Sequence, residues 1–175
     1  FSPDGQTLVT DSEDGMVRLW NWEGKLLKEF RASTNIRVWC LGFSPDGKTL
    51  ATGSKDYTAK LWDLNGKLLS EFKGHKDTVS AVAFSPDNQK VATASWDSTV
   101  KLWDLKGKEL RELSGHKDGV FSVNFSPDGQ NLATGSKDGV ARLWDLNGKL
   151  LKEFKGHLDA VRMVIFSPNG KLLVT

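Results

Sequence analysis

The sequence has few residues that could build a covalent or metal-bound framework. Its single cysteine, Cys40, cannot form a disulfide within the 175-residue chain, and three histidines with one cysteine do not supply the clustered ligands of a structural zinc site. This cysteine usage favours a reducing compartment, and we expect a cytoplasmic protein. We also expect no metal and no cofactor.

Long apolar runs and a charge of one sign are missing as well. No apolar run approaches the roughly 20 residues of a transmembrane helix, and residues 1–15 lack the basic start and apolar stretch of a signal peptide. We therefore expect no membrane partner. The net charge of +2 comes from interspersed acidic and basic residues, so nucleic-acid binding is not favoured. With 38% hydrophobic and 26% charged residues, the chain can form a globular core.

One five-residue stretch recurs at a nearly fixed spacing. FSPDG or a close variant begins at Phe1, Phe43, Phe84, Phe125 and Phe166, which gives intervals of 42, 41, 41 and 41 residues. Residues 43–83 and 125–165 differ at 11 of 41 aligned positions. Such units bury their apolar faces against their neighbours. We therefore expect one repeat array over residues 1–175, with units starting at these phenylalanines and a partial unit from Phe166.

Each unit has the pattern of four short strands. In the third unit the residues that suit a pleated sheet fall at 79–84, 90–95, 99–105 and 108–113. Connections this short join antiparallel neighbours, so each unit should be a four-stranded meander. Counting the incomplete units at both ends, we expect about 17 strands.

The turns have their own chemistry. In FSPDG, proline presets φ at the second turn position and glycine takes the positive φ that follows. Asn88 replaces that glycine in the third copy and tolerates the same conformation. Asn65-Gly66 and Asn147-Gly148 indicate hairpins between the third and fourth strands.

Two dipeptides recur beside these turns. Gly-His precedes the first strand at His75, His116 and His157, and Trp-Asp ends the third strand at Trp62, Trp103 and Trp144. With these signatures, residues 74–105 resemble a WD40 repeat, and the resemblance covers the whole chain. It implies an all-β fold, a WD40-type β-propeller segment of about four blades. We expect it to be part of a larger ring or of one completed by another copy.

Two departures from the pattern fall in the first unit. Trp20-Asn21 replaces Trp-Asp, and residues 31–36 replace Gly-His and its neighbours with one extra residue. We expect a looser boundary between units there.

The resemblance also implies a buried hydrogen-bond network in each blade. An indole N–H donates a hydrogen bond, and a hydroxyl can both accept and donate. A neutral imidazole donates from one ring nitrogen and accepts at the other, so these residue types can form a continuous chain. The set of Trp62, Ser54 and Asp56 has no histidine before its first strand, and its network should be incomplete. The implied network residues are His75, Ser95, Asp97 and Trp103 in one unit, and His116, Ser136, Asp138 and Trp144 in the next.

Two of these residue sets could also indicate chemistry. Ser95, His75 and Asp97 are the residue types of a nucleophilic triad, but the set recurs in successive units and no nucleophile elbow or oxyanion-hole loop accompanies it. The histidines lie one per blade, so they should not converge on one metal ion. We expect a structural role for both sets and no enzymatic activity.

A few positions differ while their surroundings are copied. One position holds Trp39, Ser80, Phe121 and Arg162 in successive units, and another holds Glu13, Lys55, Trp96 and Lys137. The resemblance places both near the narrow top face, where such domains commonly bind peptides. Aromatic residues and arginine suit interface hot spots, and lysines suit electrostatic steering. The candidate partner-binding residues are Trp39, Lys55, Trp96, Phe121, Lys137 and Arg162, with drift on a solvated rim as the alternative.

The sequence thus predicts a non-catalytic scaffold that binds other proteins or peptides through the top face. One alternative is a purely structural array that positions neighbouring domains. A less favoured one is nucleic-acid binding by a basic rim, with an affinity that falls steeply with salt. Exposed edges of the terminal blades would also allow self-association.

Overall fold

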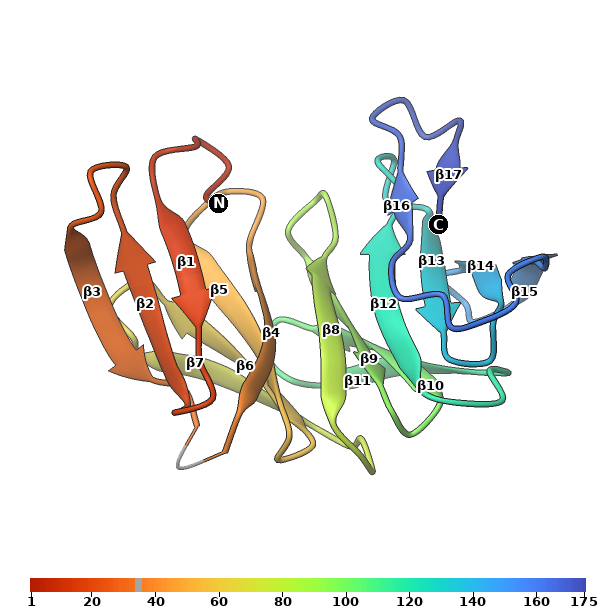
Figure 1. The fold of residues 1–175 in the computed structure, drawn as a ribbon, viewed down its shortest axis with the longest axis horizontal. Helices are drawn as coiled ribbons and strands as arrows, with labels where there is room; N and C mark the ends of the chain where they lie inside the picture. Colours follow the sequence, from red (N-terminus) through yellow and green to blue (C-terminus); the bar gives the residue numbers. More distant parts are fainter. Residues whose placement is uncertain (34–35) are drawn as a thin grey trace.

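The computed structural model describes residues 1–33 and 36–175, and strands are the regular structure in this part of the chain. They form five antiparallel sheets of three, four, four, four and two strands, and each sheet follows the order of the sequence (Figure 1). The predicted all-β fold of four-stranded meanders is confirmed. The expected looser boundary at residues 31–36 includes two residues that lie outside the described ranges.

The 17 strands within these ranges match the expected number. The first sheet contains β1 (Leu8–Asp11), β2 (Met16–Trp20) and β3 (Leu26–Arg31). The second contains β4 (Val38–Phe43), β5 (Thr49–Ser54), β6 (Thr58–Asp63) and β7 (Leu68–Lys73). The third contains β8 (Val79–Phe84), β9 (Lys90–Ser95), β10 (Thr99–Asp104) and β11 (Glu109–Ser114). The fourth contains β12 (Val120–Phe125), β13 (Asn131–Ser136), β14 (Ala141–Asp145) and β15 (Leu150–Phe154), and the last contains β16 (Ile165–Phe166) and β17 (Leu173–Val174).

The sheets stand side by side in an open arc, as in a partial propeller (Figure 1). Strand β8 contacts both β4 and β12, the first strands of the neighbouring sheets. The FSPDG-type turns lie along the upper edge of Figure 1. The opposite end carries the turns between second and third strands and the connections from one sheet to the next. We call this end the top face, although it points downward in Figure 1.

The apolar core lies between neighbouring sheets. One cluster joins Leu102 and Leu113 of the third sheet to Val120, Leu132 and Trp144 of the fourth. The second and third sheets meet in the same way, and there the ring centroids of Phe72 and Trp103 are 5.7 Å apart. Since each sheet is covered by the next, the stability of one unit depends on its neighbours.

The FSPDG turns are held by their own side chains. Asp46 Oδ1 accepts the Ser44 hydroxyl at 2.7 Å and the N–H of Lys48 at 3.1 Å. Gly47 has φ 68°, and Asn88 at the equivalent place has φ 56°. Both conformations confirm the sequence prediction, because glycine and asparagine are the residues most tolerant of positive φ.

The aspartate of Trp-Asp holds the hairpin between the third and fourth strands. Asp104 Oδ1 accepts the N–H groups of Lys106 and Lys108 at 2.9 and 3.0 Å. Asn21 Oδ1 accepts the corresponding two N–H groups in the first sheet at 3.0 and 2.9 Å. Because an amide oxygen accepts hydrogen bonds as a carboxylate does, Trp20-Asn21 keeps the same turn.

Candidate functional site

A chain of hydrogen bonds runs through the third sheet from its core to the top face. Trp103 Nε1 donates to Thr93 Oγ1 at 2.8 Å, and Thr93 Oγ1 lies 2.7 Å from His75 Nε2. On the other side of the ring, His75 Nδ1 lies 2.9 Å from Asp97 Oδ2. The chain ties the connection between β7 and β8 to β9 and β10 through groups that are nearly all buried, so it fixes how the connection into the third sheet packs.

The fourth sheet repeats this chain. Trp144 Nε1 donates to Thr134 Oγ1 at 2.9 Å, His116 Nε2 lies 2.7 Å from the same hydroxyl, and His116 Nδ1 lies 3.1 Å from Asp138 Oδ2. Its one addition is Arg142, whose Nη1 contacts both Asp138 Oδ2 and His116 Nδ1.

The hydroxyl between the two rings belongs to a threonine, so the expected place of Ser95 in this chain is wrong. Ser95 Oγ donates to the carbonyl of Asp77 at 3.0 Å and accepts the N–H of Asp97 at 3.0 Å. Residues two apart on a strand share a face but lie about 7 Å apart. The Trp103 indole therefore reaches Thr93 and stops short of Ser95.

Ser136 occupies the same place as Ser95, with bonds to the carbonyl of Asp118 at 2.9 Å and to the N–H of Asp138 at 3.1 Å. Neither serine is hydrogen-bonded to a histidine, whereas a nucleophile needs its base within such reach. The triad residue types are therefore present in the third sheet without the geometry of a triad.

The environment sets the protonation of these groups. Burial raises the pKa of Asp97, but hydrogen bonds from His75, Thr99 and the N–H of Lys76 outweigh it and hold the pKa well below its usual range. The pKa of Asp138 is lowered in the same way, because the N–H of Lys117 and the side chains of Arg142 and His116 outweigh burial. Both carboxylates are thus kept ionised by the donors around them.

His116 is held neutral. Burial is the largest cause and lowers the pKa of its imidazole, and the adjacent Arg142 charge lowers it further, while Asp138 opposes both. A neutral ring is the form that can accept a hydrogen bond at one nitrogen while donating at the other.

The second sheet lacks the histidine and has the incomplete network predicted from the sequence. Trp62 Nε1 donates to Thr52 Oγ1 at 2.9 Å, as in the other sheets. At the aspartate end of the network, Lys60 Nζ lies 3.1 Å from Asp56 Oδ2, the oxygen that corresponds to the one contacted by histidine in the third and fourth sheets. A lysine on β6 thus neutralises the aspartate, and the link from Thr52 to Asp56 is missing.

The three histidines do not converge. His157 Nε2 lies 2.7 Å from Thr175 Oγ1 in the exposed last unit, and the other two rings are held within their own sheets. Within residues 1–33 and 36–175, no three His, Cys, Asp or Glu side chains gather in a way that could hold a metal ion. In the same ranges there is no helix of the length and apolarity needed to cross a membrane.

Four of the six candidate binding residues form a continuous row on the top face. The ring centroids of Trp39 and Trp96 are 5.0 Å apart with an interplanar angle of 80°, and those of Trp96 and Phe121 are 6.4 Å apart at 74°. The guanidinium carbon of Arg162 lies 5.7 Å from the Phe121 centroid. Edge-to-face and cation–π contacts therefore connect side chains from the second, third and fourth sheets and the connection beyond.

Arg37 extends the row and was not among the binding residues predicted from the sequence. Its guanidinium carbon lies 4.1 Å from the Trp39 centroid, and its Nη1 lies 2.6 Å from Glu13 Oε1. The corresponding residues in later units are Thr78, Gly119 and Ala160. Position 37 thus varies between units as positions 39 and 96 do, and the same comparison would have found it.

The two lysine candidates line pockets beside this row. Lys55 belongs to a cavity of about 470 Å³ lined by Glu13, Ile36, Arg37, Trp39 and Lys55. Lys137 belongs to a cavity of about 320 Å³ lined by Asp77, Trp96, Asp118, Gly119, Phe121 and Lys137. We call these the first and second top-face pockets.

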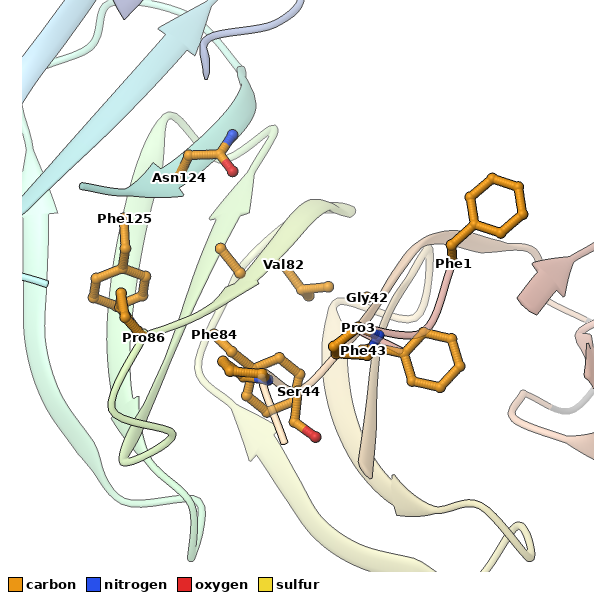
Figure 2. A pocket seen from close by; sticks show the side chains of 12 residues that line it. Phe1, Pro3, Gly42, Phe43, Ser44, Val82, Phe84, Pro86, Asn124 and Phe125 are labelled. Atoms are coloured by element: carbon orange, nitrogen blue, oxygen red, sulfur yellow. The ribbon is translucent and has the colours of Figure 1, made fainter. Parts of the chain in front are cut away.

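A larger cavity, of about 510 Å³, lies at the opposite end of the molecule. Figure 2 shows the rings of Phe43, Phe84 and Phe125 around it, with Pro86 beside them and Phe1 directed away. Two polar side chains line it, and both are already hydrogen-bonded: Asn124 Nδ2 donates to the carbonyl of Val164 at 2.7 Å, and the Ser44 hydroxyl donates to Asp46. The lining consists mainly of the rings of the repeated turns, so this cavity offers a ligand little polar recognition.

The repeated four-stranded sheets and the Trp-to-Asp hydrogen-bond chains of the third and fourth sheets are those of a partial β-propeller. The sequence family described as "WD domain, G-beta repeat" matches residues 1–21, 24–63, 66–104, 107–145 and 148–175. The chain belongs to this WD40-repeat family. No curated protein sequence matches the chain. WD40 repeats generally act as scaffolds for protein–protein interaction.

Proposed function

We propose that this chain is a non-catalytic scaffold that binds a peptide or protein segment across its top face. The observation that carries the proposal is the row from Trp39 to Arg162. Its members differ between otherwise copied units, and they still meet in one line across neighbouring sheets.

The chemistry of the row suits such a role. Trp39, Trp96 and Phe121 are partly buried, so their positions are fixed while some ring surface stays accessible, and Arg162 is exposed. Rigid aromatic side chains and arginine are the residues that most often dominate binding energy at interfaces. Trp103 and Trp144 of the blade cores, by contrast, are covered and hydrogen-bonded, and cannot touch a partner.

The test is a selection of displayed peptides on the immobilised chain, followed by affinity measurements on single-residue variants. Trp96→Ala and Arg162→Ala should each weaken the selected peptides by about tenfold or more, the size typical of hot-spot truncations. Trp22→Ala is the matched control, because Trp22 is 68% exposed but lies in the turn between β2 and β3, away from the top face. Unchanged binding by both top-face variants would remove the proposal.

The alternatives predict different results, one in the peptide selection and the other in a separate titration. A purely structural array would yield no peptides that depend on the top face. Nucleic-acid binding by a basic rim would appear in a filter-binding titration as an affinity that falls about tenfold or more as salt releases a few phosphate contacts.

A further inference from the structure

The two top-face pockets are formed by equivalent positions two units apart. Counting along the repeats, Lys137 follows Lys55 by 82 residues, and Asp118, Gly119 and Phe121 follow Ile36, Arg37 and Trp39 by the same interval. Trp96 stands in the second pocket where Glu13 stands in the first, 83 residues earlier because the first interval is one residue longer. Asp77 also lines the second pocket and has no counterpart in the first. The backbone therefore provides a similar cavity at both places, and the side chains decide what each can hold.

The charges of the two pockets are opposite. The first pocket contains Arg37 and Lys55 against the single carboxylate of Glu13. The second contains Asp77 and Asp118 against the single ammonium of Lys137. Counting one charge for each group, the first pocket is +1 and the second is −1. Both have an aromatic wall, so charge is the main difference between them.

We propose that the second pocket binds a basic side chain of the partner, and arginine in preference to lysine. This inference rests on the proposed peptide-binding function and specifies one of its subsites. A planar guanidinium can stack on an aromatic ring while it donates to a carboxylate, which suits a cavity lined by Trp96, Phe121 and two aspartates.

The two aspartates are fixed in place with acceptor capacity to spare. Asp77 Oδ1 accepts the N–H of Thr78 at 2.6 Å, and Asp118 Oδ1 accepts the N–H of Gly119 at 2.7 Å. Each carboxylate therefore has a second oxygen available. That of Asp118 lies 3.4 Å from Lys137 Nζ, and in the described part of the chain Asp77 forms no ion pair. Because the Lys137 side chain is 59% exposed, its ammonium can move into solvent when a guanidinium arrives.

Glycine keeps the second pocket open. A Cβ on Gly119 would lie 3.2 Å from the Cα of Trp96, closer than side chains normally approach. In the first pocket the equivalent Arg37 instead lays its guanidinium over Trp39. The first pocket thus carries its own arginine on an aromatic ring, and the second leaves the corresponding space to a side chain from outside.

The test uses capped amino acids as probes and the two indole N–H resonances of Trp39 and Trp96 as reporters of the two pockets. Nα-acetyl-arginine methylamide should shift the Trp96 resonance in a saturable way, and by more than that of Trp39, which lines the first pocket although its ring centroid is 5.0 Å from that of Trp96. The citrulline analogue has almost the same shape without the charge and should bind at least about fivefold more weakly. The lysine analogue should fall between them.

Variants separate the pocket from the rest of the face. Asp77→Asn and Asp118→Asn should each weaken the arginine probe about fivefold, since the amide can still accept the local N–H. Asp159→Asn is the matched control, because Asp159 occupies the same repeat position, makes the same 2.6 Å bond to the next N–H and lies outside the pocket. Lys137→Gln should strengthen binding about twofold by removing a competing cation.

Equal binding of the arginine and citrulline probes would overturn the inference, and so would arginine binding unchanged in both aspartate variants. These failures are distinct from failure of the proposed function. If selected peptides still require Trp96 while the arginine probe has no preference, the top face binds peptides and the second pocket does not select a basic side chain. If the probe behaves as expected but no selected peptide depends on the row, the pocket is real and the wider binding surface is not.

Discussion

The third and fourth sheets contain the same Trp-Thr-His-Asp chain but surround its aspartate differently. In the fourth sheet Arg142 reaches Asp138 at 2.6 Å and Glu153 at 2.9 Å. In the third sheet the equivalent Lys101 turns away from Asp97 and lies 2.9 Å from Glu109 and 2.6 Å from Glu112. The basic residue at this position of the third strand thus pairs with the network aspartate in the fourth sheet, and with glutamates on the outer strand in the third.

The hydroxyl of Thr99 is an additional donor to Asp97 in the third sheet. It donates to Asp97 Oδ1 at 2.6 Å, whereas Val140 at the equivalent place has no hydroxyl to give. In the second sheet, Thr58 donates to Asp56 Oδ1 at 2.6 Å and Lys60 supplies the charge. The aspartate therefore accepts hydrogen bonds in each of these three sheets, but the donors differ from sheet to sheet.

The largest test of this comparison is to remove the basic residue from each sheet. Arg142→Met should lower the free energy of unfolding by about 3 kcal/mol, because the side chain is 4% exposed and its loss leaves buried Asp138 short of a partner. Lys101→Met should cost under about 1 kcal/mol, since the glutamates it leaves are 38% and 46% exposed and can be solvated. Urea unfolding followed by tryptophan fluorescence measures both, and equal losses would show that the two positions do the same work.

The burial of His116, together with the adjacent Arg142 charge, makes the fourth sheet sensitive to mild acid. The pKa of His116 is lowered from 6.5 in the fold, so the unfolded chain takes up the proton first. Stability is fully present above about pH 6.5 and falls as the pH drops toward the folded pKa, by at most about 1.4 kcal/mol for each pH unit. A second loss should follow below pH 3.8, the ordinary pKa of Asp97 and Asp138, since the pKa of each is lowered in the fold.

His116→Gln is the control for the first window, because glutamine does not titrate. Urea midpoints at about pH 7.5 and about pH 5.5 should converge in this variant relative to the parent. An identical pH dependence in the two proteins would show that His116 does not carry it.

Repetition made most of the fold predictable from the sequence. Periodic phenylalanines, turn residues and alternating strand patterns located the strands, and position by position they identified the aspartates and the core tryptophans. The choice between Thr93 and Ser95 failed, because both hydroxyls lie on one face of β9 and only the reach of the Trp103 indole separates them. Recurrence does not separate them either, because threonine at positions 10, 52, 93 and 134 and serine at positions 12, 54, 95 and 136 repeat alike.

The sequence predicted which residues form most of the candidate site, but not which of them contact one another. Variation between copies pointed to the positions of Trp39 and Trp96, yet no local pattern places two rings from different units 5.0 Å apart. That distance depends on how neighbouring sheets pack. The opposite charges of the two pockets likewise emerge only when residues from adjacent units are brought to one cavity.

A smaller test exchanges the hydroxyl between the two sheets. Thr99→Val should cost about 1–2 kcal/mol, because a hydrogen bond to a buried carboxylate is lost. Val140→Thr should raise the free energy of unfolding by up to about 1 kcal/mol. The backbone geometry is shared, because the N–H of residue 140 donates to Asp138 Oδ1 at 3.0 Å and that of residue 99 donates to Asp97 Oδ1 at 2.9 Å. Hydrogen exchange at the amides of β10 and β14 assigns each change to its sheet, and a loss on Val140→Thr would contradict the shared geometry.

The smallest test lies one residue before that hydroxyl. Ser98 has φ 70° where the fourth sheet has Gly139 with φ 77°, so the third sheet holds a side chain in the left-handed region. Strain there is of order 1 kcal/mol, and glycine removes it while adding a comparable freedom to the unfolded chain. Ser98→Gly should therefore change the unfolding free energy by under about 0.5 kcal/mol.

The reverse change, Gly139→Ser, should lower the unfolding free energy by about 1 kcal/mol because of the positive φ. Steric crowding adds nothing, since a Cβ there would lie 3.5 Å from the carbonyl oxygens of His157 and Asp159, an ordinary contact distance. A cost well above that in a thermal melt would mean that the fourth sheet packs this turn more tightly than the third does, and that the two turns are not interchangeable.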